Sequence, residues 1–592
     1  MNEALTILQD TFGYKRFRGK QEEVINHILD GNSAFVLMPT GGGKSICYQI
    51  PALLMDGMTV VVSPLIALMQ DQVATLGELG VDALYLASNL DSEQTRNVFF
   101  RIKQKQIKLL YVTPERACST WFINFLQSVN INLLAIDEAH CISHWGHDFR
   151  PEYQKLSALC QAFPKVPRLA LTATADNFTS VDIKHYLGLK DSKEFTTSFL
   201  RENLIYLVYE KKNAKSQLTD FISKHKNSCG IIYCNSRARV DEITKFLQEN
   251  GYPAKSYHAG LDAKIREEHH YYFLQNNYAI IVATVAFGLG IDKPDVRYVY
   301  HFDMPRSIDL FYQESGRAGR DGMPAYSIIN FGFKEILDLN RMIIDSESGQ
   351  LKKKYELMKL KRIIEYCDTN KCRTQALLEF MEEKTPACGK CDNCTNPPQM
   401  VESTVLVQKI LSTIYRVGQK FSTPHIIDIL RGKSSVTVQI WEHNKLSTFG
   451  LCSEKSIKEL RRTIRILYSR SIIDIDYTNG NLKLNDKAIR ILRGLDGLSL
   501  PTERKSYNRS IKEYDTWLRT EFEDRLYRKL LDWRHAMAIA MHVAHYAILP
   551  DKTIYELVTI KPQSTEELMN IYGIGKSRLE KFGSNLLKLI KQ

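Results

Sequence analysis

A glycine-rich loop is the first stretch of the chain whose residue types could do chemistry. In MPTGGGKS, backbone N–H groups around the glycines can face phosphate oxygens, Lys44 can reach the terminal phosphates, and the Ser45 hydroxyl can bind Mg²⁺. The loop departs from the full G-x-x-x-x-G-K-[ST] pattern because Met38 stands at the first glycine position. It still predicts a nucleotide site, with the candidate residues Thr40, Gly41, Gly42, Gly43, Lys44 and Ser45.

Two further motifs supply the charges that phosphoryl transfer requires. LLAIDEAH places Asp137 and Glu138 directly after an apolar run, where one carboxylate can hold Mg²⁺ and the other can position or deprotonate an attacking water. QESGRAGRDG offers Arg317 and Arg320, which can neutralise charge on the transferred phosphoryl group. We therefore predict a site that hydrolyses a nucleotide with Mg²⁺ bound by Ser45 and Asp137.

Three of the twelve cysteines form a metal-binding pattern. Cys388, Cys391 and Cys394 are separated by two residues each, a spacing that brings their thiolates to one tetrahedral Zn²⁺ ion. A fourth thiolate must come from upstream, where Cys367 and Cys372 are both available. Four thiolates without another obvious donor favour a closed structural site over a catalytic one.

Parallel sheets are the elements predicted to hold these side chains. Between residue 32 and about residue 331, short apolar or β-branched runs alternate with longer amphipathic stretches, a pattern typical of strands joined by crossover helices. The segment 199–216 lacks this signal and is predicted to join two such domains, with the second sheet starting at Gly230. The predicted strands are AFVLMP, TVVVSP, LLYVTPE, LLAIDE, RLALTAT, GIIYCNS, AIIVAT, VRYVYHF and YSIINF.

The rest of the chain carries a different pattern. Residues 351–394 are predicted to be helical around the cysteines, and the stretch TNPPQM indicates a boundary. IIDIDYTNGNLKL predicts two strands with a turn at Asn479 and Gly480. Residues 520–592 are predicted to be wholly helical.

Composition and charge narrow the class of protein. With 592 residues, 44% hydrophobic and 25% charged, the chain is predicted to be globular and multidomain. Its formal net charge is +12, and the excess comes from residues after 350, which indicates a polyanion partner for the later domains or a solvated basic surface. Neither a long apolar run nor a signal-peptide layout is present, so we expect no membrane segment and a cytoplasmic location.

The order of the motifs resembles that of superfamily 2 helicases, and the chain resembles the RecQ family of DNA helicases over nearly its whole length. The resemblance implies an ATP-dependent enzyme with two RecA-like domains and ATP in the cleft between them. The matching stretches are TFGYKRFRGKQ, MPTGGGKS, VVSPLIALMQDQ, DEAHCISHWGHDFRPEY, LTATA, IIYCNSR, IIVATVAFGLGIDKPDVRYV and QESGRAGRDG.

The resemblance also implies roles for single residues around the nucleotide and the metal. Tyr14 would pack on adenine, Gln21 would hydrogen-bond the edge of the base, and Arg18 would support the nucleotide. Cys372, which stands beside an arginine at the head of a helix, would be the fourth zinc ligand. The catalytic candidates are then Lys44, Asp137, Glu138, Gln313, Arg317 and Arg320.

An aromatic segment just after the carboxylates resembles the RecQ loop that couples single-stranded DNA binding to ATP hydrolysis. Stacking of a base on an aromatic side chain contributes about 1 to 3 kcal/mol and tolerates any sequence, as a translocating motor requires. Ordinary core packing of Trp145 and Phe149 is the alternative. The DNA-binding candidates in CISHWGHDFR are His144, Trp145, His147, Phe149 and Arg150.

Two C-terminal regions resemble the accessory domains of the same family. Residues 403–500 resemble the winged helix, where Tyr477 near the hairpin tip could separate a terminal base pair. Residues 520–592 resemble the helical HRDC domain, where Lys576 would approach phosphate beside a glycine turn. The arginines expected to form a basic face for duplex phosphates are Arg461, Arg462, Arg465 and Arg470.

The predicted architecture is α/β and multidomain. The expected domains are RecA-like domain 1 (residues 1–202), RecA-like domain 2 (203–345), a helical zinc-binding module (346–400), a winged helix (401–505) and an all-helical HRDC domain (515–592).

The resemblance implies a helicase that uses ATP, Mg²⁺ and Zn²⁺, moves 3′ to 5′ on single-stranded DNA and unwinds forked or recombination-type duplexes in DNA repair and recombination. A nucleoid-associated location, and single-strand-binding and repair proteins as partners, would follow. Two alternatives are an RNA helicase of the related DEAH class and a DNA-binding or annealing protein whose ATP site has decayed. The aromatic loop and the C-terminal modules disfavour the first, and the intact catalytic candidates disfavour the second.

Overall fold

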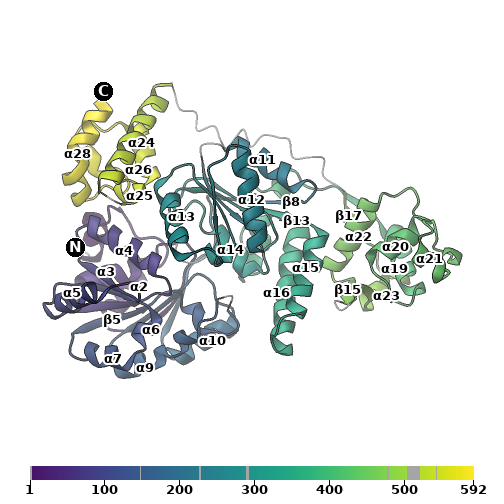
Figure 1. Cartoon of the computed structure of the whole chain (residues 1–592), viewed down its shortest axis with the longest axis horizontal. Helices are drawn as coiled ribbons and strands as arrows, with labels where there is room; N and C mark the ends of the chain where they lie inside the picture. Colours follow the sequence, from purple (N-terminus) through teal and green to yellow (C-terminus); the bar gives the residue numbers. More distant parts are fainter. Residues whose placement is uncertain are drawn as a thin grey trace.

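The computed structural model describes residues 3–146, 148–225, 228–287, 293–476, 479–502, 521–541 and 543–591. Two lobes, each built on a parallel sheet, stand next to each other, and a smaller domain lies beyond the second lobe (Figure 1). The C-terminal helices return to lie against the first lobe. The predicted α/β multidomain architecture with two parallel sheets is therefore confirmed.

Lobe 1 contains a seven-stranded sheet in the order β3-β4-β2-β5-β6-β1-β7, in which every pairing is parallel. Strands β1, β2 and β5 are buried throughout, which explains their unbroken apolar sequences. The strands are β1 (Ala34–Leu37), β2 (Met58–Val62), β3 (Ala83–Leu86), β4 (Leu109–Val112), β5 (Ile131–Ile136), β6 (Arg168–Thr172) and β7 (Lys193–Thr196).

Because β1 and β5 run in the same direction, the segments that follow them leave the sheet at the same edge. This places MPTGGGKS and DEAH next to each other. The helices of lobe 1 are α1 (Glu3–Asp10), α2 (Gln21–Leu29), α3 (Ile46–Leu54), α4 (Ile66–Glu78), α5 (Ser92–Lys103), α6 (Pro114–Ala117), α7 (Thr120–Leu126), the 3-10 helix η1 (Ala139–Ile142), α8 (Pro151–Gln154), α9 (Leu156–Ala162) and α10 (Asn177–Tyr186).

Lobe 2 contains a six-stranded parallel sheet in the order β10-β11-β9-β12-β13-β8. The strands are β8 (Leu204–Glu210), β9 (Cys229–Tyr233), β10 (Ala254–Tyr257), β11 (Ile280–Ala283), β12 (Val296–His301) and β13 (Ala325–Phe331). The helices are α11 (Ala214–Lys224), α12 (Arg237–Glu249), α13 (Ala263–Gln275), the 3-10 helix η2 (Val285–Phe287), α14 (Ile308–Ser315) and α15 (Phe333–Ile344).

The prediction that residues 199–216 only join the two domains, with the second sheet starting at Gly230, is wrong. Strand β8 lies within that segment and pairs with β13 along its full length. It is the last strand in the sheet order, and its final residues are only half-buried, so it lacks the continuous apolar signature of the central strands.

The remaining described segments are largely helical, as the sequence pattern predicted. The zinc module consists of α16 (Gln350–Asp368), α17 (Arg373–Glu379) and α18 (Asp392–Thr395). The next domain contains β14 (Met400–Glu402), α19 (Thr404–Arg416), α20 (Thr423–Leu430), α21 (Val436–Ile440), the 3-10 helix η3 (His443–Lys445), α22 (Ile457–Ser469), β15 (Ile473–Asp476), β16 (Asn481–Leu484), α23 (Asp486–Leu492) and β17 (Ser499–Pro501). Strands β15 and β16 pair antiparallel, as predicted for the hairpin.

The C-terminal domain has an apolar core of its own, separate from those of the lobes. Its helices are α24 (Glu521–Met541), α25 (His545–Ile548), α26 (Asp551–Ile560), α27 (Thr565–Met569) and α28 (Lys576–Lys591). Among the described residues, the helices include none with the length and hydropathy needed to cross a bilayer.

Candidate nucleotide, DNA and zinc sites

The glycine-rich loop lies between β1 and α3 and is shaped by two left-handed glycines. Gly41 has φ +78° and Gly43 has φ +79°, backbone conformations that residues other than glycine rarely adopt. A Cβ on Gly43 would also lie 2.5 Å from Gln21 Nε2. That amide donates hydrogen bonds to the carbonyls of Gly42 (3.2 Å) and Gly43 (3.0 Å), so Gln21 supports the loop from behind.

Met38, the residue that breaks the consensus pattern, contributes through its backbone. Its carbonyl accepts a hydrogen bond from Lys44 Nζ at 3.3 Å. Its side chain fills the space where a Cβ on Gly42 would stand, 2.8 Å from that position. The substitution therefore leaves the loop and the lysine in an arrangement suited to phosphate.

The two carboxylates follow β5 and differ in environment. Burial and the neighbouring carboxylate of Glu138 raise the pKa of Asp137 above its usual range. Burial acts in the same direction on Glu138, but His140 and Lys44 outweigh it, so the pKa of Glu138 lies below its usual range. Two adjacent carboxyls with different proton affinities suit two different roles, holding a metal and orienting water.

Glu138 is held in a left-handed backbone conformation, with φ 48° and ψ 45°. Its carboxylate lies 3.3 Å from His140 Nδ1, and the same nitrogen lies 2.9 Å from the hydroxyl of Thr172. His140 thus connects Glu138 with the LTATA segment at the end of β6. Sequence reasoning assigned no role to His140, although it stands within DEAH.

A cavity of about 290 Å³ lies between the lobes and contains nearly every predicted nucleotide and catalytic residue. Gln313 Nε2 and Arg317 Nε line it, are buried, and have no hydrogen-bond partner among the described residues. Buried donors of this kind are costly unless a ligand satisfies them, so the cavity fits an anion. The predicted residues that line it are Tyr14, Arg18, Gln21, Thr40, Gly41, Gly43, Lys44, Ser45, Asp137, Glu138, Gln313, Arg317 and Arg320.

Arg201 connects the walls of this cavity, and sequence reasoning missed it. Its Nη1 donates to the Thr40 carbonyl in the glycine-rich loop at 2.6 Å. Its Nη2 donates to the carbonyls of Ala318 and Gly319 at 3.0 and 2.9 Å, in the loop that carries the two arginines. The residue lies before β8, in the segment that carried no recognisable signal, so no motif singled it out.

The C-terminal domain lies against the side of the cavity that Tyr14 and Arg18 form. The Tyr572 ring packs on Tyr14 with centroids 5.4 Å apart, and the Tyr572 hydroxyl accepts a hydrogen bond from Arg18 at 3.1 Å. Tyr546 donates to the Asp71 carboxylate on α4. Tyr546 and Tyr572 both line the cavity. Three parts of the chain therefore surround the predicted nucleotide site.

Lys576, predicted to approach DNA phosphate, lies at this same contact. Its Nζ forms an ion pair with Asp10 at 2.7 Å, and the nearby Lys581 pairs with Glu78 at 2.9 Å. Gly573 N–H donates to the Gly13 carbonyl, so the glycine turn meets backbone of lobe 1. The structure thus places the basic end of this domain against acidic side chains of lobe 1.

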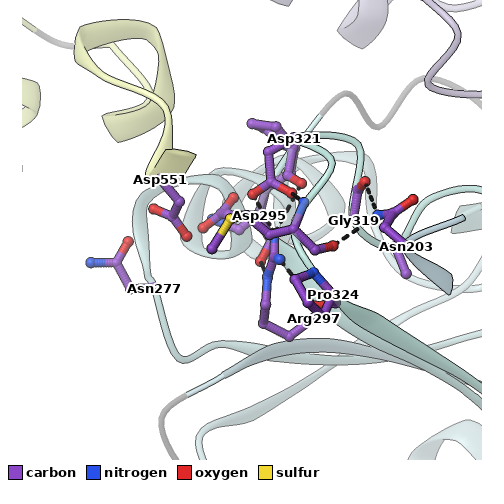
Figure 2. A network of polar contacts seen from close by, with 12 residues as sticks. Asn203, Asn277, Asp295, Arg297, Gly319, Asp321, Pro324 and Asp551 are labelled. Carbon is purple, nitrogen blue, oxygen red and sulfur yellow. Dashed lines mark hydrogen bonds and ion pairs between the residues drawn. The ribbon is translucent and has the colours of Figure 1, made fainter. Parts of the chain in front are cut away.

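The C-terminal domain also contacts lobe 2 through polar side chains, and Figure 2 shows its Asp551 beside Asp295 of lobe 2. Arg534 pairs with Asp551 at 2.7 Å and donates to Asn277 of lobe 2 at 3.1 Å. His545 lies in full burial with its Nε2 3.1 Å from Asp295 and 3.2 Å from Lys293. Arg297 and Asp321 pair behind Asp295 and hold the turn that follows the two arginines of the cavity.

The aromatic segment lies between η1 and α8, with His144 exposed and Trp145 half-buried. His144 and Phe149 are in ring contact, with centroids 3.7 Å apart. Arg150 donates to the Pro64 carbonyl at 2.8 Å and pairs with Asp148, so it holds the loop to the segment after β2. Trp145 packs against other aromatic rings, and His147 lies outside the described residues.

Four thiols meet in the zinc module. The Sγ atoms of Cys372, Cys388, Cys391 and Cys394 all lie within 4.8 Å of one another. Cys391 Sγ is 3.9 Å from Cys372 Sγ and 3.5 Å from Cys394 Sγ, close to the roughly 3.8 Å expected between thiolates around tetrahedral zinc. Cys367 is buried elsewhere and does not belong to the group, so the donor set fits Zn²⁺ with Cys372 as the fourth ligand.

The prediction that Arg465 belongs to a basic face of α22 that binds duplex phosphates is wrong. That side chain is buried and pairs with Asp368 at 3.0 Å and with Glu210 at 3.4 Å. Helical spacing placed it near the other arginines, but its position on α22 faces lobe 2 and the zinc module. Arg462 donates to the Thr502 carbonyl, whereas Arg461 is exposed. Tyr477 lies outside the described residues.

Five family models match the chain in sequence order. They are DEAD/DEAH box helicase (residues 18–181), Helicase conserved C-terminal domain (213–322), RecQ zinc-binding (333–395), RQC domain (397–509) and HRDC domain (523–590). The zinc-binding model covers the four clustered thiols, and the RQC model covers the hairpin.

Relatives that the chain matches over nearly their whole length belong to the same family as the matching models. The chain is 39% identical to the ATP-dependent DNA helicase RecQ of Pasteurella multocida, over 100% of this chain and 94% of that protein. It is 40% identical to the protein of the same name from Haemophilus influenzae (100% and 96%) and 35% identical to that from Bacillus subtilis (100% and 99%). Identity at this level over the whole length shows that the chain belongs to the RecQ family of helicases.

Proposed function

We propose that the protein is an ATP- and Mg²⁺-dependent DNA helicase that moves 3′ to 5′ along single-stranded DNA and unwinds forked or recombination-type duplexes. One observation carries the proposal. The glycine-rich loop, the two carboxylates and the two arginines line a single cavity between the lobes, where buried donors await an anion. Hydrolysis in such a cavity changes how tightly the lobes are held together.

Each cavity residue has a role in the proposed reaction. Lys44 and the loop N–H groups bind the phosphates, and Arg317 and Arg320 neutralise charge on the transferred phosphoryl group. Glu138 orients and deprotonates the attacking water, and His140 keeps the carboxylate in place. Ser45 and Asp137 would hold Mg²⁺, whose charge stabilises the leaving phosphates.

The DNA-binding part of the proposal rests on the aromatic segment. Trp145, His144 and Phe149 offer ring surfaces on which bases can stack regardless of sequence. Arg150, together with Arg461 and Arg462 in the winged helix, would contact phosphates. The polarity and the preference for forked duplexes follow the family resemblance, as do a role in repair with single-strand-binding and repair proteins and a location at the nucleoid.

The test combines ATPase and strand-separation assays. Single-stranded DNA should stimulate ATP hydrolysis, and a 3′-tailed duplex should be unwound in preference to a 5′-tailed one. Lys44→Ala should abolish both activities. DNA-stimulated hydrolysis that survives in Lys44→Ala, or stimulation by RNA alone, would contradict the proposal.

A further inference from the structure

The Trp145 ring packs against two aromatic rings from outside its own loop. Phe178, at the start of α10, lies with its centroid 5.9 Å away, and Tyr355, on α16, lies 5.1 Å away at 73°. Phe178 and Tyr355 also meet each other edge to face. Because Tyr355 belongs to the zinc module, this cluster joins lobe 1 to the part of the chain that follows lobe 2.

Lys359, one helical turn after Tyr355, makes three polar contacts at the same place. Its Nζ donates to the Trp145 carbonyl at 3.2 Å and lies 3.4 Å from Asp176 and 3.2 Å from Asp309. Although burial opposes the charge, Asp309, Tyr355 and Asp176 raise the pKa of Lys359 above its usual range. The ammonium is therefore charged and shared by two carboxylates and a carbonyl.

Asp176 connects this cluster with lobe 1. It follows LTATA, caps α10 by accepting from Thr179 N–H at 2.9 Å, and accepts a hydrogen bond from the Tyr355 hydroxyl. Burial raises its pKa, but Tyr355, the cap and Lys359 outweigh this and hold the pKa below its usual range. Thr172 in the same motif contacts His140, the partner of Glu138.

Asp309 connects the cluster with lobe 2. It stands in the first turn of α14, the helix that carries Gln313 and ends two residues before Arg317. Lys359 thus lies between the loop that holds Trp145 and the helix that leads to the catalytic arginines. Distances on both sides are those of direct ion pairs.

We propose that Tyr355 and Lys359 are positioning residues that hold the Trp145 loop to α14 when no DNA is bound, and that a DNA base opens this latch by competing for the Trp145 ring. The proposal rests on the proposed function, which supplies the DNA. A base that stacks on Trp145 competes with Phe178 and Tyr355, because both already contact the ring. Once the loop moves, Lys359 loses the Trp145 carbonyl and no longer ties the Trp145 loop to α14.

The latch stabilises only the DNA-free state. This determines in which direction a weaker latch changes the ATPase rate and its dependence on DNA. A change that weakens the latch shifts the population towards the open state. The DNA concentration for half-maximal ATPase stimulation should then fall and the DNA-free rate should rise by a similar factor. The rate at saturating DNA should stay the same, because the latch is already open there.

Tyr355→Phe is the sharpest variant, since it keeps the ring and removes only the hydroxyl that binds Asp176. We expect about a 2- to 10-fold fall in the half-activating concentration of a poly-dT oligonucleotide, as for loss of one hydrogen bond. Tyr271→Phe, at an exposed tyrosine on α13, is the matched control and should leave both quantities unchanged. An unchanged half-activating concentration in Tyr355→Phe, or a fall only in the saturated rate, would overturn the latch.

One variant that keeps the positive charge and one that removes it check that Lys359 acts through its ion pairs. Lys359→Arg should retain most of the DNA dependence, whereas Lys359→Gln should raise the DNA-free rate. Equal behaviour of the two variants would count against the bridge. Thermal melting of each variant separates these effects from general loss of structure.

Fluorine NMR on protein carrying 5-fluorotryptophan tests the latch without any activity measurement. The chain has five tryptophans, and Trp145→Phe identifies the relevant resonance. Poly-dT should shift this resonance, an abasic oligonucleotide of equal length should not, and Tyr355→Phe without DNA should move it part of the way. A Trp145 resonance that does not change when DNA is added would overturn the latch. If Tyr355→Phe shifts this resonance but DNA does not stimulate ATP hydrolysis by the unaltered protein, the proposed function is overturned instead.

Discussion

Arg201 joins the two walls of the nucleotide cavity through its 2.6 Å hydrogen bond to the Thr40 carbonyl. Its other nitrogen binds the loop that carries Arg317 and Arg320. One planar guanidinium therefore fixes the distance between the phosphate loop and the arginines, a task that needs several donors in a fixed geometry.

Arg201→Lys should uncouple these loops, because an ammonium is a point donor and cannot reproduce the fork. We expect DNA-stimulated kcat to fall about 10-fold or more, as for misplacement of a catalytic group. The free energy of unfolding should fall by about 2 to 3 kcal/mol, since buried carbonyls lose partners. Steady-state ATPase assays and denaturant titration measure the two effects, and wild-type rates in the variant would contradict the bridging role.

Glu138→Gln should separate binding from hydrolysis. The amide keeps the size of the side chain but cannot accept a proton from water, so kcat should fall about 100-fold or more while ATP still binds. Rapid-quench hydrolysis and equilibrium binding of a fluorescent ATP analogue measure these properties. A matched loss of binding would instead mean that Glu138 holds the nucleotide.

Cys391→Ser should remove the metal from the zinc module. Its thiol is central to the cluster, with contacts to Cys372 and Cys394. We expect one zinc per chain in the unaltered protein, near zero in the variant, and a lower melting temperature. Cys367→Ala, at the buried thiol outside the cluster, should keep the zinc. Elemental analysis of freshly purified protein measures the zinc content of both variants, and zinc retained in Cys391→Ser would contradict the prediction.

Tyr572→Ala should weaken ATP binding although the residue belongs to the C-terminal domain. Tyr572 contacts Tyr14 and Arg18, the residues predicted to hold the adenine. Loss of an aromatic contact worth about 0.5 to 1.5 kcal/mol should raise the KM for ATP about 2- to 10-fold with little change in kcat. Tyr572→Phe keeps the ring, so its KM for ATP should stay close to that of the unaltered protein. A fall in KM would show that the tyrosine occupies the place of the base.

Acid should loosen the contact between the C-terminal domain and lobe 2. Burial, Lys293 and Arg534 lower the pKa of His545 to about 4, despite the nearby Asp295. An unfolded histidine titrates near pH 6.5, so between roughly pH 6.5 and 4 the unfolded chain binds more protons and stability falls as pH is lowered.

At about pH 5 the loss from this one ring approaches 2 kcal/mol. His545→Gln removes the titration, so the difference in unfolding midpoint between pH 7.5 and about pH 5 should be smaller in the variant. Equal pH dependence in both proteins would assign the effect to other groups.

The local signals in the sequence were sufficient for the inner strands of both sheets and for the glycine-rich loop and carboxylates of the cavity, but not for the outermost strands β3, β7, β8 and β10. Asp137 and the glycine-rich loop follow buried strands, and parallel strands bring such segments to one edge. Cys372 was found by resemblance and then by geometry, since spacing alone left Cys367 open. Long-range contacts had no such signal. Arg201 acts on carbonyls more than a hundred residues away, and nothing in its neighbourhood marks it.

The same limit applies to faces and domain contacts. Arg465 has the spacing of a DNA-facing arginine, but α22 turns it towards Asp368. Lys576 lies in a basic stretch, yet its partner in the structure is Asp10 of lobe 1. The charge of a residue can be read from the sequence, whereas the acidic surface that it meets depends on how separate domains pack.

The left-handed backbone at Glu138 introduces strain at a position that also carries a candidate catalytic side chain. A non-glycine residue in that conformation costs about 1 kcal/mol, and its carboxylate also repels the buried Asp137. Glycine there would relieve both, but it would also remove the attraction of His140 and Lys44 for the carboxylate. The backbone strain at residue 138 is therefore offset by the partners of its carboxylate, which keep that group ionised beside the cavity.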